Sequence, residues 1–123
     1  MFENSVITQL TVKDFDINGN QVSISNPKFK NKDGCIMIYA PWCPHCRDAE
    51  ELINYIDKIF KQHPDLGMNI GVVNGSDNIN QKLVQALGLQ GFPSYYHVVC
   101  QSGKISKFTD AGYELLEEFK KSM

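Results

Sequence analysis

Apolar residues follow two patterns along this chain, short runs and helical repeats. Residues 35–40 are entirely apolar and residues 68–73 mostly so, which is typical of strands buried on both faces of a sheet. From Pro44 the apolar residues recur at helical spacing, which predicts an amphipathic helix that Pro64 ends. Its apolar face would hold Ala49, Leu52, Ile53, Ile56, Ile59 and Phe60, and its polar face Asp48, Glu50, Glu51, Asp57 and Lys58.

The N-terminal third alternates between apolar and polar residues. Residues 5–12 predict a first strand, and residues 21–25 predict a short second strand. Residues 16–20 between them contain an Asn-Gly pair, which is typical of a hairpin turn. Residues 26–34 are polar and contain a proline, so they predict a loop with room for one helical turn.

The C-terminal half continues the alternation of strands and helices. A helix that Asp77 or Asn78 can cap, and that Gly88 stops, follows the strand at 68–73. Its apolar residues are Ile79, Leu83, Val84 and Leu87. Residues 94–100 and 105–109 predict two strands joined by a Ser-Gly turn, and a closing helix would carry Tyr113, Leu116 and Phe119. This order predicts one α/β domain over residues 1–123, with a central mixed β-sheet flanked by helices on both faces.

Composition and charge set limits on partners. The 123 residues are 42% hydrophobic and 21% charged, with a formal net charge of −2 and no long run of one sign. This balance argues against nucleic acid or an anionic membrane as the main partner. No apolar stretch reaches the roughly 20 residues that span a bilayer, and residues 1–5 do not resemble a secretory signal. We therefore expect a monomer in the cytoplasm, unless a signal has been removed.

The segment Trp42-Cys43-Pro44-His45-Cys46 lies where a buried strand gives way to the amphipathic helix. A thiolate is the reactive form of cysteine, and the unpaired N–H groups and partial positive charge of a helix N-terminus stabilise it. The two cysteines therefore predict redox chemistry. A metal site with His45 or His63 as a further ligand is the alternative, but a closed zinc site needs four ligands and the sequence has no second such pair.

Residues 39–46, Tyr-Ala-Pro-Trp-Cys-Pro-His-Cys, resemble the active-site segment of the thioredoxin superfamily. Their flanks are most similar to the protein disulfide isomerase catalytic domain, and the central Pro-His pair is similar to that of bacterial periplasmic dithiol oxidases. Gly91-Phe92-Pro93-Ser94, before a predicted strand, resembles the cis-proline turn of the same superfamily. With the order of elements, the resemblance covers about residues 5–122 and implies a thioredoxin-like fold.

The resemblance also implies roles for the residues of the motif. Cys43 would be the exposed attacking thiol, and Cys46, one turn further and more buried, would resolve the mixed disulfide. Pro44 and His45 would tune the redox potential, because an imidazolium beside a thiolate stabilises the reduced form; a solvated His45 without a role is the alternative. One pKa unit corresponds to about 30 mV, so a depression of two or three units could separate a reductant from an oxidase.

Substrate contacts and departures from the family pattern follow from the same resemblance. Pro93 would be cis beside the cysteine pair, and Phe92 would offer its backbone N–H and C=O groups to an extended substrate. Trp42 has two open interpretations, an apolar contact surface or a packing residue. Most of the superfamily has a buried acid, often near a lysine on the neighbouring strand, where this chain has Met37 and Val72. The usual proton acceptor for the resolving thiol is therefore missing.

Three further residues bear on the chemistry. Arg47 is the only arginine, so the last-loop arginine of the isomerase family is also missing. Arg47 itself would be a solvated helix residue or a source of positive charge. Cys35 and Cys100 are predicted close together at the far end of two antiparallel strands. We expect two buried thiols there, with a second disulfide or a metal pair as the alternative.

Two functions are consistent with these residues. The first is exchange of disulfides with protein thiols or disulfides, without a cofactor and with glutathione or another thiol redox protein as the electron partner. The direction of electron transfer is open. The lack of a visible secretory signal favours reduction of substrates, whereas the Pro-His pair favours their oxidation. The second is a non-catalytic binding or scaffold module, which the apolar Met37 and Val72 favour.

Overall fold

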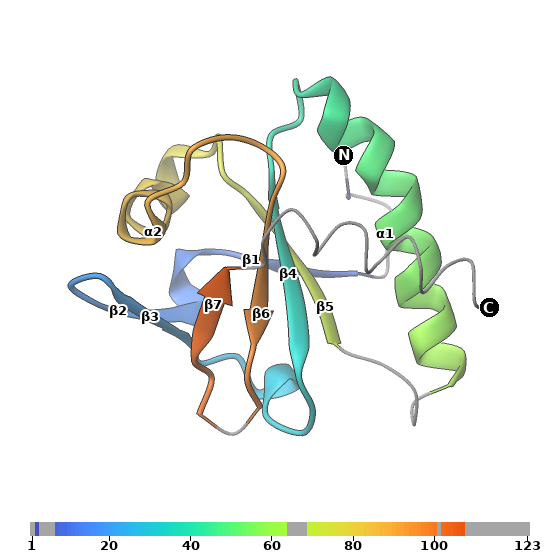
Figure 1. Cartoon of the computed structure of the whole chain (residues 1–123), viewed down its shortest axis with the longest axis horizontal. Helices are drawn as coiled ribbons and strands as arrows, with labels where there is room; N and C mark the ends of the chain where they lie inside the picture. Colours follow the sequence, from blue (N-terminus) through green and yellow to red (C-terminus); the bar gives the residue numbers. More distant parts are fainter. Residues whose placement is uncertain (1, 3–6, 64–68, 101, 108–123) are drawn as a thin grey trace.

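The computed structural model describes residues 2, 7–63, 69–100 and 102–107. Five strands form one sheet in the order β1-β5-β4-β6-β7 (Figure 1). Their bounds are Thr8–Leu10 for β1, Gly34–Tyr39 for β4, Asn69–Asn74 for β5, Ser94–Val98 for β6 and Ile105–Lys107 for β7. β1, β5 and β4 are parallel, whereas β6 and β7 are each antiparallel to their neighbours. The predicted mixed sheet is confirmed.

Helices cover both faces of this sheet. α1 (Pro44–Gln62) packs on one face, and α2 (Gln81–Leu87) packs on the other beside a small two-stranded sheet (Figure 1). Each face has its own cluster of buried side chains, one under α1 and one under α2. The predicted architecture of helices on both faces therefore holds for the described residues.

The central strand β4 explains why residues 35–40 are continuously apolar. Cys35, Met37 and Tyr39 belong to the cluster under α1, whereas Ile36 and Ile38 belong to the cluster under α2. Successive side chains of a strand point to opposite faces, so a strand between two helical layers has no polar side. All six residues of β4 are buried.

A hairpin follows the first strand and was predicted only in part. The strand predicted over residues 5–12 ends at Leu10, and Val12–Asp14 forms a 3-10 turn. β2 (Phe15–Asn18) then pairs antiparallel with β3 (Gln21–Ile24), so the prediction of a turn over 16–20 was wrong for residues 16–18. In β2 the apolar Phe15 and Ile17 alternate with the exposed Asp16 and Asn18. A period of two puts the apolar side chains on one face of a strand.

The segments on either side of β3 are short turns. The hairpin turn contains only Gly19 and Asn20, and Gly19 has φ +63°, which a glycine adopts at little cost. Pro27–Phe29 forms the single helical turn for which the predicted loop had room. The Asn26 side chain caps this turn, and Phe29 is buried.

α1 begins at Pro44 as predicted, and Pro64 lies outside the described residues. Asp57 was wrongly assigned to its polar face. The residue is only 4% exposed, and its Oδ2 lies 2.7 Å from Nζ of Lys61. Asp57 follows directly after the buried Ile56, so it lies at the edge of the apolar stripe, and the lysine one turn later supplies its counter-charge.

The second helix is preceded by a 3-10 turn, Asn78–Asn80, that Asp77 caps. Ile79 lies in that turn and is 48% exposed, so its assignment to the apolar face of the helix was wrong. Gly88 ends α2 in the left-handed conformation, as predicted. Within the described residues, no helix is long and apolar enough to cross a membrane.

The first of the two predicted C-terminal strands is shorter than expected. β6 ends at Val98 rather than at residue 100, and Gly103 turns the chain into β7 with φ +68°. The end of the predicted strand over 105–109 and the predicted closing helix lie outside the described residues, with Tyr113, Leu116 and Phe119.

Candidate active site

The two cysteines of the motif lie at the start of α1. Cys43 is the N-cap residue, and Pro44 occupies the first turn, where its missing N–H costs no hydrogen bond. The backbone N–H of Cys43 donates to the carbonyl of Ala40 at 3.1 Å, which closes a tight turn between β4 and α1. The side chain of Cys43 therefore lies beside the unpaired N–H groups of the helix end.

Both thiols are free, and Cys43 is close enough to Cys46 to raise its pKa. Cys46 is 0% exposed, as the prediction of the more buried thiol requires. The expectation that Cys43 is exposed was wrong, because only 6% of its surface is accessible. The Cys43 S–H donates to the carbonyl of Phe92 at 3.5 Å, so the loop before β6 covers this sulfur.

Burial is the largest of the causes that raise the pKa of the Cys46 thiol to about 12. The backbone of Ala40 lowers this pKa, and the neighbouring Cys43 raises it. Met37 and Val72 lie side by side in the β4–β5 register, and both are buried. The buried carboxylate of this face, Asp57, lies eleven residues beyond Cys46, about 16 Å along the helix. It is too far away to accept a proton from that thiol.

The loop before β6 brings a second set of residues to the cysteine pair. The Phe92–Pro93 peptide bond is cis, and the Ser94 hydroxyl donates to the carbonyl of Gly91 at 2.7 Å. The ring of Phe92 packs over Gly75, leaving no room there for a Cβ atom. These contacts place the Phe92 carbonyl against a cysteine 49 residues earlier in the chain.

Trp42 and Phe92 form an aromatic pair beside Cys43. Their ring centroids are 5.8 Å apart and their planes meet at 89°, an edge-to-face contact. Trp42 nevertheless remains 66% exposed. It therefore has both features that the sequence left open, a packing contact on one side and an apolar surface on the other.

The first turn of α1 also carries His45 and Arg47, and both are exposed. Arg47 is not simply solvated, because its Nε–H donates to the carbonyl of Pro41 at 3.2 Å. Sequence reasoning missed this contact. Helical spacing gives no signal for it, because Pro41 lies before the helix begins.

Cys35 and Cys100 differ from each other more than expected. Both are free thiols, but only Cys35 is fully buried, and burial raises its pKa to about 12. Cys100 is half-buried and lies beyond the end of β6. Its backbone N–H donates to Oδ1 of Asp33 at 3.0 Å, and Oδ2 of the same carboxylate lies 2.9 Å from Nε2 of His97. No pattern in the sequence singles out Asp33.

The alternative of a metal site has no support in the part of the chain that the structure describes. No three His, Cys, Asp or Glu side chains converge there as ligands. His63 is at the opposite end of α1 from Cys43, about 30 Å away along the helix axis.

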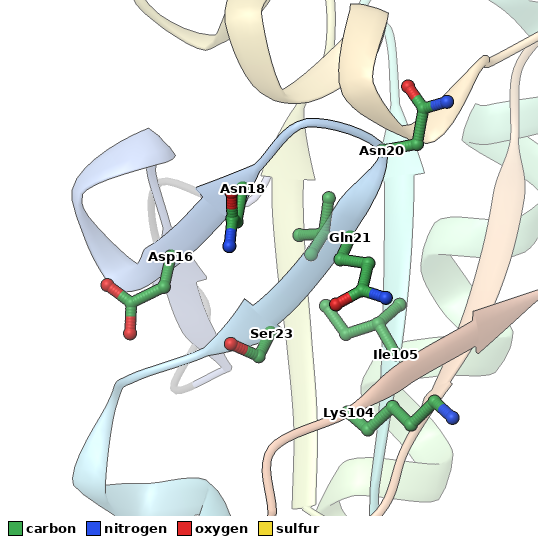
Figure 2. A pocket seen from close by; sticks show the side chains of 8 residues that line it. Asp16, Asn18, Asn20, Gln21, Ser23, Lys104 and Ile105 are labelled. Atoms are coloured by element: carbon green, nitrogen blue, oxygen red, sulfur yellow. The ribbon is translucent and has the colours of Figure 1, made fainter.

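A groove of about 660 Å³ lies along the β2–β3 hairpin (Figure 2). Polar side chains of the hairpin and of the start of β7 line it, among them Asp16, Asn18, Gln21 and Lys104. It shares no residue with the site around Cys43, so it plays no part in the chemistry of the two thiols.

Comparison with known proteins supports the same family. The Thioredoxin family model matches residues 7–122. Protein disulfide-isomerase A4 of Bos taurus is 29% identical over 93 residues, which are 75% of this chain and 13% of that protein. Protein disulfide-isomerase of Gallus gallus is 27% identical over 92 residues, 75% of this chain and 16% of that protein. This chain thus spans less than a fifth of the length of these relatives.

Among solved structures, mitochondrial thioredoxin 3 of Saccharomyces cerevisiae in its oxidised form has a TM-score of 0.59 at 18% identity, with 95% of each chain covered. This likeness confirms the thioredoxin-like α/β fold. The family match extends over nearly all of the sequence, including the cysteine pair and the Phe92–Pro93 loop. The chain therefore belongs to the thioredoxin family.

Proposed function

We propose that this protein is a thiol–disulfide oxidoreductase that exchanges disulfides with protein substrates through Cys43 and Cys46. The observation that carries the proposal is a pair of free thiols one turn apart at the start of α1, with Cys43 as the N-cap and close enough to raise the pKa of Cys46. Relatives named as protein disulfide isomerases support the same class of reaction.

Each step of the exchange transfers one sulfur–sulfur bond. In the reducing direction the Cys43 thiolate attacks one sulfur of a substrate disulfide, forms a mixed disulfide and releases the other sulfur as a thiolate, which takes up a proton. The Cys46 thiolate then attacks the Cys43 sulfur, so the Cys43–Cys46 disulfide forms and the second substrate thiol leaves. Two electrons and two protons pass to the substrate, and glutathione or another thiol redox protein returns them. The reverse sequence oxidises a substrate dithiol.

The neighbouring residues have roles in this proposal. Trp42, Phe92 and Pro93 form the substrate contact, and the Phe92 carbonyl, which accepts from Cys43 in the dithiol form, becomes an acceptor for an extended substrate. A protonated His45, with Pro44 beside it in the first turn, stabilises a nearby thiolate and so makes the disulfide a stronger oxidant.

Three serine variants test the proposal. Cys43→Ser should abolish both insulin reduction and dithiol oxidation, whereas Cys46→Ser should accumulate mixed disulfides because the resolving thiol is missing. Cys100→Ser is the matched control, since this thiol lies outside the site, and should keep wild-type turnover. Wild-type turnover in both Cys43→Ser and Cys46→Ser would refute the proposal. The reduction potential of the pair against glutathione then sets the direction, with the single tryptophan, Trp42, as the probe.

A binding or scaffold module is the second candidate, because the buried pair Met37 and Val72 offers no proton acceptor to Cys46. Such a module would bind its partner equally well when Cys43 and Cys46 are both replaced by serine. Rapid, reversible exchange of the wild-type protein with glutathione would count against it.

A further inference from the structure

Arg47 is bonded to the loop that precedes the attacking cysteine. Its Nε–H donates to the carbonyl of Pro41 at 3.2 Å, and its backbone N–H donates to the carbonyl of Cys43 at 3.2 Å. Pro41 and Trp42 are the two residues between Ala40 and Cys43 in the turn that leads into α1. The side chain therefore bridges the first turn of the helix and the loop before it.

The peptide group that Arg47 holds is the one that joins Pro41 to Trp42. The indole of Trp42 in turn packs edge-to-face on Phe92, and the Phe92 carbonyl accepts from the Cys43 thiol. A movement of the Pro41 carbonyl would therefore shift the exposed ring of Trp42 relative to both Phe92 and the sulfur. We call Trp42 and Phe92 the aromatic rim.

We propose that Arg47 is a positioning residue that holds the aromatic rim beside Cys43, and that it thereby favours polypeptide substrates over small disulfides. The inference rests on the proposed function and deepens it. A polypeptide must lie across the rim to bring its sulfur to Cys43, whereas a small disulfide needs only access to that sulfur. Arg47 takes no part in the transfer of sulfur.

Position and charge can be separated by substitution. Arg47→Met keeps an unbranched side chain and removes every donor, whereas Arg47→Lys keeps the charge but lacks the Nε–H that reaches Pro41. Lys58→Met is the matched control, because it removes a positive charge from an exposed position on the same helix, away from the loop. Salt adds a further distinction, since it screens attraction between exposed charges but leaves a hydrogen bond to a neutral carbonyl in place.

Two measurements test the inference. The first is acrylamide quenching of Trp42, the only tryptophan, in the reduced protein. The second is the ratio of the rate with insulin to the rate with hydroxyethyl disulfide. We expect Arg47→Met to increase the quenching of Trp42 and to lower this ratio about fivefold, equivalent to about 1 kcal/mol. The rate with hydroxyethyl disulfide should change less than twofold. Arg47→Lys should recover only part of the loss, Lys58→Met should match wild type, and the wild-type ratio should be insensitive to salt.

Several results would overturn the inference. Unchanged Trp42 quenching in Arg47→Met would show that the loop does not depend on this contact. Full recovery of the rate ratio in Arg47→Lys would assign the effect to charge. Equal losses of the rates with insulin and with hydroxyethyl disulfide would assign it to the sulfur chemistry. A wild-type protein without any exchange activity would refute the proposed function instead, and the quenching comparison would still decide whether Arg47 holds the rim.

Discussion

Cys46 should resolve a mixed disulfide slowly at neutral pH, at a rate that rises steeply with pH. Burial is the largest cause that raises the pKa of this thiol from 9.0 to about 12. The neighbouring Cys43 also raises this pKa, and that contribution is lost once Cys43 is bonded to a substrate, but burial persists. Among the residues that the structure describes, no buried acid takes the place of the apolar Met37 and Val72 as an acceptor for the proton.

Two opposing effects set the size of the slowing. Three pKa units lower the thiolate fraction at pH 7 about thousandfold. The more basic thiolate is a better nucleophile by about 0.4–0.5 log units per pKa unit, or about 15- to 30-fold in total. The loss of thiolate therefore dominates. Because the part of the shift that Cys43 causes is absent in the mixed disulfide, roughly 30- to 60-fold is the upper bound on how much slower Cys46 resolves than an ordinary thiol of pKa 9.0.

The assay follows the second half of the exchange alone. In a Cys100→Ser background, Cys43 is converted to a mixed disulfide with dithionitrobenzoate, and release of the second thionitrobenzoate reports attack by Cys46. We expect the rate to rise about tenfold per pH unit from pH 7 to about pH 10, because the thiolate fraction rises by that factor below the pKa. Cys46→Ser, which should release a single equivalent, is the control.

The shape of the pH profile decides the matter. A plateau at or below pH 9 would refute the reasoning, because it would mean that Cys46 loses its proton near its ordinary pKa in the mixed disulfide. A nearby group, with His45 as the obvious candidate, would then have to accept the proton.

Three further predictions concern stability. Burial raises the pKa of Cys35 from 9.0 to about 12, so the unfolded chain loses this proton at a lower pH than the folded protein does. The free energy of unfolding should therefore fall above pH 9, by up to about 1.4 kcal/mol per pH unit. In denaturant unfolding, Cys35→Ala should lose less stability between pH 9 and pH 12 than the wild type does. Hydrogen bonds from the Cys100 backbone and from His97 hold the pKa of Asp33 below its ordinary 3.8, so the carboxylate stabilises the fold above about pH 4 and loses this effect at lower pH. Because the carboxylate is partly exposed, Asp33→Asn should lower the free energy of unfolding by less than about 1 kcal/mol at pH 7 and not at all near pH 2. Thermal melts of the variant and the wild type at the two pH values would reveal this difference. Gly75→Ala should destabilise the fold by about 1–3 kcal/mol, because the new methyl group meets the ring of Phe92. Trp42 packs on that ring, so its exposure to quenchers should also increase. An unchanged melting temperature would contradict the close packing of Phe92 on Gly75.

Local sequence was sufficient to place the elements that build the cysteine site. The apolar run at 35–40, the change to helical spacing and Pro44 locate the strand, the turn and the helix start, because each signal depends on residues close together in the chain. The hairpin was harder to locate, since Phe15 and Ile17 give only two apolar positions for β2. Asp57 was misplaced because a residue at the edge of an apolar stripe is buried or exposed according to what packs on it.

The sequence by itself determined that two thiols lie one turn apart at the start of a helix, since helix geometry fixes that relation without any help from the rest of the chain. Tertiary structure decided what surrounds them, and only the family resemblance, not any local pattern, indicated that Phe92 and Pro93 would lie there. The register of β6 on β4 brings Phe92 against Cys43 and Asp33 against Cys100, and this register joins segments more than forty residues apart. Contacts of this kind depend on how whole strands pair and pack, which no local pattern of residues specifies.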